Sequence, residues 1–278
     1  MMISVVILTC NSGGHIHNCL ASLAAQGVDD LEVIVVDNAS MDKTISIIAG
    51  ECPQAWLIRN ETNRGASQAR NQGVAHARGA WVLSLDSDVI LGPDFLREFL
   101  LAAKGFADNI GMVQTNILDA DGTRVYSQGV YLSPWRRFHD INRGRPAGAA
   151  YPGVRKILGP CSAAAFYRRT MLEQVREQTG YFDERFFFLV EDVDLAWRAR
   201  RAGWGVTFCP RVQCRHRGNG SGTNSLMRQY LSFRNRYLMI NKNESFWRRL
   251  GTYALALPYD VTRFFYMMLV NPYMRQEK

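Results

Sequence analysis

Short, nearly continuous apolar runs alternate with segments of helical spacing, and this alternation limits the possible folds more than any other feature. Runs of strand type occupy residues 3–8, 31–36, 55–59 and 81–85, and helical patterns separate them. Runs without polar alternation are typical of parallel strands that are buried on both faces. Strands that alternate with helices imply right-handed crossovers. We therefore expect an α/β fold with a mainly parallel, Rossmann-like central sheet flanked by helices.

The rhythm changes after residue 106. We expect a strand at 111–118, an antiparallel partner at 125–132, a helix that begins near residue 168, a helix at 191–202, and short strands at 204–209 and 212–214. The basic segment 133–156 is rich in glycine, proline and arginine and predicts a loop over the functional site.

Two aspartates, Asp86 and Asp88, directly follow the fourth apolar run. Carboxylates at the carboxyl end of a strand suit a hard divalent cation, which takes oxygen ligands and often keeps a substrate phosphate as another. Open α/β sheets also bind ligands at these strand ends. On this stretch alone, capping of a turn and of the following helix explains the two aspartates equally well.

Further carboxylates follow other expected elements: Asp37 ends the second run, and Glu191 and Asp192 begin a helix. Each has a simple explanation, as a turn residue or as a favourable charge at a helix N-terminus. Together they would place several like charges around one cleft, where they repel unless a cation or hydrogen-bond donors intervene. A metal at Asp88 would relieve that repulsion and neutralise a diphosphate, with Arg70 among the supporting basic residues.

Composition narrows the range of partners. The net charge of +8 (33 basic minus 25 acidic residues) favours nucleotide phosphates, an anionic membrane surface or nucleic acid. The six cysteines are scattered, as in reduced thiols of a cytosolic protein, and we see no N-terminal signal pattern. Cys209, Cys214 and His216 would suggest zinc, but their spacing is loose and there is no second cysteine pair.

An ordered set of motifs resembles that of family 2 glycosyltransferases, which have the GT-A fold, over about residues 3–240. The matching segments are 6–11 (VILTCN), 35–40 (VVDNAS), 63–65 (NRG), 69–71 (ARN), 85–88 (LDSD), 182–187 (FDERFF), 191–195 (EDVDL), and His216 with 218–221 (GNGS). A single D-x-D is a weak signal, whereas the ordered set is specific. Within the family, the chain is most similar to bacterial rhamnosyltransferase-like enzymes that build cell-surface polysaccharide.

The resemblance implies roles for the matching residues on the donor side. Thr9 and Asn11 would line the base and ribose pocket, Asp37 would bond to the pyrimidine ring, and Asp86 would hold the ribose. Asn63, Gly65 and Arg70 would complete the nucleotide-binding set.

The resemblance also implies the metal and catalytic residues. Asp88 would bind Mg²⁺ or Mn²⁺ and His216 would be a further ligand, although a loop histidine between Arg215 and Arg217 is an odd setting for one. Asp192 would be the base of a single inverting displacement. Glu191, Cys161 and Arg234 would contact or support the acceptor.

The resemblance also suggests how the chain is divided. Residues 1–222 would form the catalytic domain, with a nucleotide-binding half at about 1–105 and an acceptor-binding half at 106–222. Residues 223–278 would form a C-terminal helical region. Pro258, Asp260 and Arg263 interrupt its apolar stretch well short of the roughly 20 residues that a spanning helix needs.

The C-terminal region leaves two interpretations open. Aromatic residues beside arginines suit an interfacial helix on an anionic membrane. Packing on the catalytic domain or on a second copy in an oligomer is the alternative. We expect a cytoplasmic protein that is peripheral on the inner face of the plasma membrane.

These features predict a metal-dependent, inverting glycosyltransferase that moves a sugar, with rhamnose as one candidate, from a nucleoside-diphosphate sugar to a hydroxyl of a lipid-linked or cell-surface glycan. A Gln-x-x-Arg-Trp motif is missing, which favours addition of one or a few sugars. A sugar nucleotidyltransferase is an alternative, but residues 9–14 lack the basic residue of a phosphate loop. A basic nucleic-acid-binding module is another, and the carboxylates argue against nucleic acid as a partner.

Overall fold

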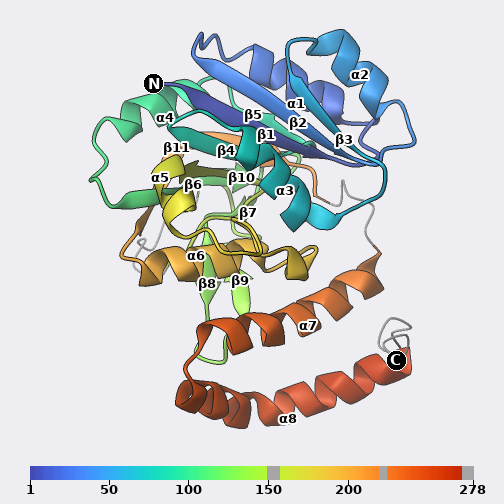
Figure 1. The fold of residues 1–278 in the computed structure, drawn as a ribbon, viewed down its shortest axis with the longest axis vertical. Coiled ribbons are helices and arrows are strands. Elements are labelled where there is room, and N and C mark those ends of the chain that lie inside the picture. The colour runs from blue at the N-terminus through green and yellow to red at the C-terminus, as the bar shows by residue number, and fades with distance from the viewer. Residues whose placement is uncertain (149–156, 219–223, 271–278) are drawn as a thin grey trace.

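The computed structural model describes residues 1–148, 157–218 and 224–270. Figure 1 shows a central sheet with helices on both faces and two further helices stacked beneath this body. Three predictions lie wholly or partly outside the described residues. They concern residues 149–156 of the expected loop, residues 219–221 of the last motif, and the domain boundary at 222/223.

The first half of the sheet is parallel, as the apolar runs predict. Its strands are β1 (Ile3–Thr9), β2 (Leu31–Asn38), β3 (Trp56–Asn60) and β4 (Trp81–Asp86), in the order β3-β2-β1-β4. The connecting helices are α1 (Ile16–Ala24), α2 (Thr44–Glu51) and α3 (Gly65–His76). Side chains on β1 alternate between two cores: Val5 packs with α1 and α2, and Val6 packs with α3. The sheet is therefore covered on both faces.

Beyond β4 the sheet becomes mixed. The next strands are β5 (Val89–Leu91), β6 (Ile110–Leu118), β7 (Val125–Ser127), β10 (Ala164–Arg168) and β11 (Gly205–His216). β10 runs antiparallel between β4 and β6, whereas β11 runs parallel to β6 and antiparallel to β5. Helices α4 (Phe95–Ala103), α5 (Arg169–Gln174) and α6 (Glu191–Arg201) pack on the sheet. The α/β class is confirmed, with antiparallel pairs in its second half.

Local elements differ from the sequence-based expectation in three places. The expected strand 125–132 divides at Gly129, whose φ of 116° ends β7 before β8 (Val130–Leu132) begins. β8 pairs with β9 (Phe138–Asp140), which lies within the segment expected to be a loop. The two short strands expected at 204–214 are one strand, β11, with a register shift between Cys209 and Gln213.

Two long helices, α7 (Ser225–Asn243) and α8 (Phe246–Val270), end the described chain. Met239 and Ile240 of α7 are fully buried against Val190 and Val193, beside the first turn of α6. α8 lies on the far side of α7 (Figure 1), and Pro258 lies within it. Across the described ranges, we find no helix whose length and hydropathy would let it span a bilayer.

Candidate active site

A cavity of about 370 Å³ opens at the carboxyl ends of β1 and β4. Most residues implicated from the sequence line it: Thr9, Asn63, Gly65, Arg70, Asp86, Asp88, Cys161, Glu191, Asp192 and His216. Three do not. Asn11 is exposed and accepts a hydrogen bond from the backbone of Met41, Asp37 is buried near the end of β2, and Arg234 lies on α7.

A buried imidazole–carboxylate pair lies on the donor side of the cavity. Nε2 of His216 lies 3.0 Å from Oδ1 of Asp88, and both side chains are buried. The antiparallel pairing of His216 with Val89 brings β11 next to β5, and so brings His216 to an aspartate far away in the sequence. His216 was expected in a loop between two arginines, but the pairing of β11 with β5 determines where it lies.

Asp86, Asp88 and His216 fit a divalent cation. Each offers one ligand atom, and these atoms lie within 4.8 Å of one another. Nε2 of His216 is the ring nitrogen beside the carboxylates, 3.0 Å from Asp88, whereas the buried Nδ1 has no hydrogen-bond partner among the described residues. Two carboxylates and an imidazole are donors that Mg²⁺ or Mn²⁺ accepts. Burial raises the pKa of Asp86, with the charge of Asp88 adding to it and that of Arg70 opposing it, and a bound cation would favour its ionised form.

Arg70 joins the carboxylates on the two sides of the cavity. Its guanidinium lies 2.9 Å from Asp86 and 2.5 Å from Glu191, and its Nε donates to Ser84. The Arg70 and Glu191 side chains are 5 % and 6 % exposed, so these charges are compensated by each other and not by water. These buried contacts hold the end of β4, which carries Asp86, and the start of α6, which carries Glu191, in a defined arrangement.

Glu191 and Asp192 are neighbours in sequence but differ in their environment. Burial raises the pKa of Glu191 to about 7, the charge of Arg70 lowers it, and that of Asp192 raises it. Asp192 is partly exposed to the cavity, where Oδ2 accepts from the backbone of Ser162 and Oδ1 from that of Val193. Burial likewise raises the pKa of Asp192. Both line the cavity, but Glu191 is buried and paired with Arg70, whereas Asp192 is the more exposed of the two.

The donor side carries buried polar atoms without protein partners. Within the described ranges, neither Thr9 Oγ1 nor Asp37 Oδ1 has a hydrogen-bond partner, although Asp37 Oδ2 accepts from the backbone of Ser40. Buried polar atoms are normally satisfied, so the unmet hydroxyl of Thr9, which lines the cavity, suits a hydrogen bond to a ligand. Ser12 and Ser87 bond to each other at 2.7 Å and tie the loops after β1 and β4 together.

Three cavity residues were not identified from the sequence. Tyr126 packs its ring against that of His216, with 4.3 Å between the ring centroids. Arg143 lies over the Tyr126 ring and donates a hydrogen bond to Asp140. They come from β7, β9 and the following turn, and no local motif marks them. Their proximity depends on the pairing of β7 with β6 and of β8 with β9.

The zinc alternative finds no support. Throughout residues 1–148, 157–218 and 224–270, no group of three metal-type ligands includes Cys209 or Cys214. Both thiols are buried, and burial raises the pKa of Cys214 to about 12, which opposes thiolate formation. His216 turns to Asp88 instead.

The family model described as glycosyl transferase family 2 matches residues 4–176, more than half of the chain. The chain belongs to this family. It is 27% identical over 282 residues to the N-acetylglucosaminyl-diphospho-decaprenol L-rhamnosyltransferase of Mycobacterium tuberculosis, covering 89% of this chain and 87% of that protein. A low-salt glycan biosynthesis hexosyltransferase from Haloferax volcanii is 26% identical over 86% of this chain and 75% of its own length. The similarity to rhamnosyltransferases is confirmed.

Solved structures support the same fold for this family 2 member. S. aureus TarS 1–349 in complex with UDP matches all of this chain and 76% of its own, with a TM-score of 0.60 and 19% identity. A mannosyltransferase from Pyrobaculum calidifontis in complex with GDP-Man and Mn²⁺ matches 97% of this chain and 75% of its own, with a TM-score of 0.59 and 20% identity. A longer TarS chain is covered over 44% of its length. The chain is thus a glycosyltransferase with the expected GT-A fold.

Proposed function

We propose that this glycosyltransferase is metal-dependent and inverting, and that it takes its sugar from a nucleoside-diphosphate sugar. The observation that carries the proposal is the presence, in one cavity, of the Asp86, Asp88 and His216 group and of the partly exposed Asp192. One group suits a diphosphate with its cation, and the other suits an acceptor hydroxyl. UDP and GDP-Man bound to proteins of the same fold are consistent with such a donor.

On the donor side, Asp88 and His216 would hold Mg²⁺ or Mn²⁺, and Asp86 would bind the ribose of the nucleoside. When bound, the cation neutralises charge on the diphosphate. The unmet oxygens of Thr9 and Asp37 are the atoms we assign to the ribose and the base. Asn11, Asn63 and Gly65 complete this set.

On the acceptor side, Asp192 would accept the proton of the attacking hydroxyl. The bonds from Ser162 and Val193 orient its carboxylate, which stays partly open to the cavity. In a single displacement, the acceptor oxygen bonds to the anomeric carbon as the bond to the diphosphate breaks. Glu191 would support this step through Arg70, and Cys161 would line the acceptor subsite. Arg234, on α7, would support the acceptor side indirectly, by donating a hydrogen bond to the backbone oxygen of Arg185.

We propose that residues 1–105 supply the nucleotide side except for His216, and that residues 106–222 supply the acceptor side. Of the proposed C-terminal region 223–278, the described part, 224–270, contains α7 and α8. For the acceptor, the relative whose name states an N-acetylglucosaminyl-diphospho-decaprenol substrate favours a lipid-linked glycan, and transfer of one or a few sugars, including rhamnose.

We also propose that α8 contacts the membrane. Large apolar side chains are exposed along it, among them Trp247 at 79% and Phe265 at 63%, and Arg248 lies beside Trp247. Apolar and basic residues on one interfacial helix suit an anionic lipid surface. A Trp247→Ser, Phe265→Ser variant should lose co-sedimentation with vesicles that contain phosphatidylglycerol. Trp56→Ser, which removes an exposed tryptophan from β3, should retain it. Failure of the unaltered protein to sediment with these vesicles would contradict the proposal.

Thermal unfolding with UDP, dTDP and GDP and their sugars, each with and without Mn²⁺, tests the donor and the metal together. One nucleotide should stabilise the protein in a Mn²⁺-dependent way, by about 2.7 kcal/mol at a hundredfold excess over its dissociation constant. His216→Gln should abolish the Mn²⁺ dependence, whereas His139→Gln, an exposed histidine on β9, should keep it. Equal stabilisation with and without Mn²⁺ by every nucleotide would refute metal dependence.

A further inference from the structure

The loop that leads into α6 has an unusual backbone. Phe187, Leu189 and Val190 have φ values of 62°, 69° and 77°, although none of them is glycine. Left-handed backbone is unfavourable for such residues, particularly for a β-branched valine, and persists only where the surroundings impose it. Val190 directly precedes Glu191 and Asp192, so the conformation of this loop determines where both carboxylates lie.

A buried asparagine of α7 imposes part of this conformation. Nδ2 of Asn235 lies 2.8–2.9 Å from three carbonyl oxygens of the loop, those of Phe186, Phe188 and Leu189. Asn235 is fully buried, and Arg234 donates to its Oδ1, which orients the amide with its N–H groups toward the loop. Buried carbonyls need donors. The Phe186 carbonyl also accepts from the backbone N–H of Phe188, whereas within the described residues those of Phe188 and Leu189 accept from Asn235 of α7.

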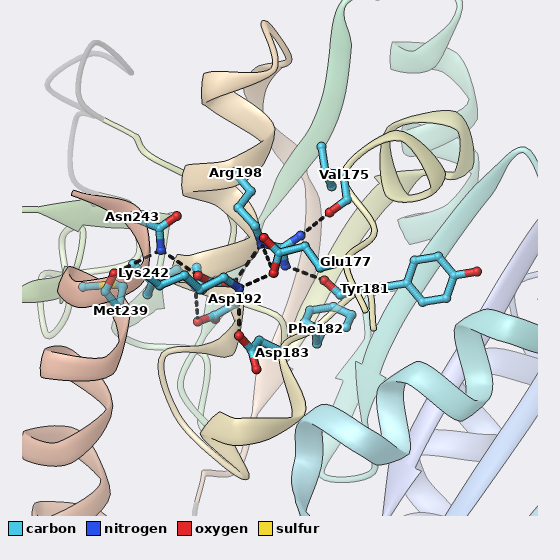
Figure 2. A network of polar contacts seen from close by, with 12 residues as sticks. Val175, Glu177, Tyr181, Phe182, Asp183, Asp192, Arg198, Met239, Lys242 and Asn243 are labelled. Atoms are coloured by element: carbon cyan, nitrogen blue, oxygen red, sulfur yellow. Dashed lines mark hydrogen bonds and ion pairs between the residues drawn. The ribbon is translucent and has the colours of Figure 1, made fainter. Parts of the chain in front are cut away.

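A second anchor, Lys242 on α7, holds α6 at Asp194, which follows the two carboxylates in the helix. Nζ of Lys242 lies 2.6–2.8 Å from carboxylate oxygens of Glu177, Asp183 and Asp194 (Figure 2). Asn243 donates to the other oxygen of Asp194 at 2.7 Å. Asp183 and Asp194 are fully buried, so the ammonium group of Lys242 compensates their charges where water does not.

The opposite side of the loop contacts the nucleotide-binding half. The backbone N–H of Ser67 donates to the carbonyl of Phe187, and the space beside Gly65 is filled by Phe187. The loop is therefore held between α3 and α7. A change in α7 would act first on the acceptor-side carboxylates, and would reach the donor side through the contact of Glu191 with Arg70, which also bonds Asp86.

We infer that α7 is the positioning element of the catalytic carboxylate, with Asn235 and Lys242 as positioning residues on either side of Asp192. This inference rests on the proposed role of Asp192 as the base. It assigns α7 to the catalytic unit, and leaves only α8 for contacts with membrane or partner. Neither residue touches the cavity, so both act through the backbone that they hold.

The test compares Asn235→Asp, which keeps the side-chain shape but loses the N–H donors, with Asp260→Asn. Asp260→Asn weakens a buried ion pair with Arg236, also on α7, that does not touch the loop. Two quantities are measured: hydrogen exchange of the amides at 186–195, and steady-state transfer from UDP-N-acetylglucosamine, dTDP-rhamnose and GDP-mannose to N-acetylglucosaminyl diphosphate on a short polyprenol. Lys242→Met is the second variant and is used in the same way if Asn235→Asp does not fold.

We expect exchange at 186–195 to accelerate at least tenfold in Asn235→Asp, kcat to fall by about 10–100-fold, and the KM for the donor to stay within twofold. Asp260→Asn should lower the melting temperature but leave exchange in this segment and kcat unchanged. Wild-type kcat in a folded Asn235→Asp or Lys242→Met variant would overturn the inference, whether or not exchange changes. Full activity of Asp192→Asn would instead refute the proposed base, and the exchange result would then still report on the anchoring of the loop.

Discussion

Nη1 of Arg70 lies 2.5 Å from Oε1 of Glu191, and this buried contact links α3 on the nucleotide side to α6 on the acceptor side. The same guanidinium contacts Asp86, so one cation compensates two carboxylates that the resemblance assigns to different substrates. The geometry of the donor subsite and that of the acceptor subsite are therefore coupled through a single side chain.

Loss of Arg70 should destabilise the protein strongly. Arg70→Gln leaves Glu191 and Asp86 without their cation, and breaking a buried ion pair by removing one partner costs about 3–5 kcal/mol. Urea denaturation should show this loss in the free energy of unfolding. Arg64→Gln makes the same substitution at an exposed position in the preceding loop and should change stability little. Equal stability of the two variants would mean that the Arg70 pairs contribute no net stability.

Asp192→Asn should separate catalysis from donor binding. The amide keeps the shape of the side chain but cannot accept the proton, so kcat should fall by about 10²–10⁴-fold. Nucleotide affinity with Mn²⁺ should stay near the wild-type value, because Asp192 lies on the acceptor side. Steady-state kinetics and titration calorimetry measure the two quantities. Wild-type kcat would refute the assignment, and loss of nucleotide binding would move Asp192 to the donor side.

The rate should fall as the pH is lowered through the pKa of Asp192. A base must be ionised, and burial raises the pKa of Asp192 above its ordinary value, so the acid limb should lie at a higher pH than an unburied aspartate would give. The charge of Asp140 raises the pKa further, so Asp140→Asn should shift the limb to lower pH. Asp121→Asn, at an exposed turn, should not shift it. A limb that moves to higher pH in Asp140→Asn would contradict this assignment.

Gly65→Ala should disturb the loop that precedes α6. A Cβ at Gly65 would lie 2.5 Å from both Cδ2 and the backbone oxygen of Phe187, and the φ of +81° costs a residue with a Cβ about 1–2 kcal/mol by itself. We expect a lower melting temperature and faster hydrogen exchange around Phe187. Gly50→Ala is the matched control: Gly50 lies in α2 with nothing within 4 Å, so the change should be neutral or stabilise by about 0.5–1 kcal/mol. A melting temperature equal to wild type for Gly65→Ala would show that Phe187 moves aside at no cost.

Local patterns predicted the first half of the fold well. The run 81–85 corresponds to β4, and Asp86 and Asp88 lie at its carboxyl end beside the cavity, because burial on both faces leaves a clear apolar signature. Contacts between distant segments leave no such signature. β9 lies in a basic segment of mixed composition and forms only because β8 pairs with it.

Individual residues show the same distinction. Motif resemblance was needed to connect His216 with Asp88, since β11 reaches β5 only in the completed sheet. Asn235 lies in an ordinary basic helix, and its three carbonyl partners are 46–49 residues away in sequence. Its role could be recognised only in the structure, where it donates to carbonyl oxygens of a loop with left-handed backbone.

The separation of Asp88 and His216 in the chain, 128 residues, has a consequence for the order of assembly. An emerging polypeptide would contain both aspartates of the D-x-D stretch long before it contains the imidazole. The nucleotide-binding half alone therefore lacks one of the metal ligands that we propose, and acquires it only when the last strand joins the sheet. Metal-dependent nucleotide affinity would thus report that β11 has joined the sheet, a step that involves residues preceding α7 in the chain.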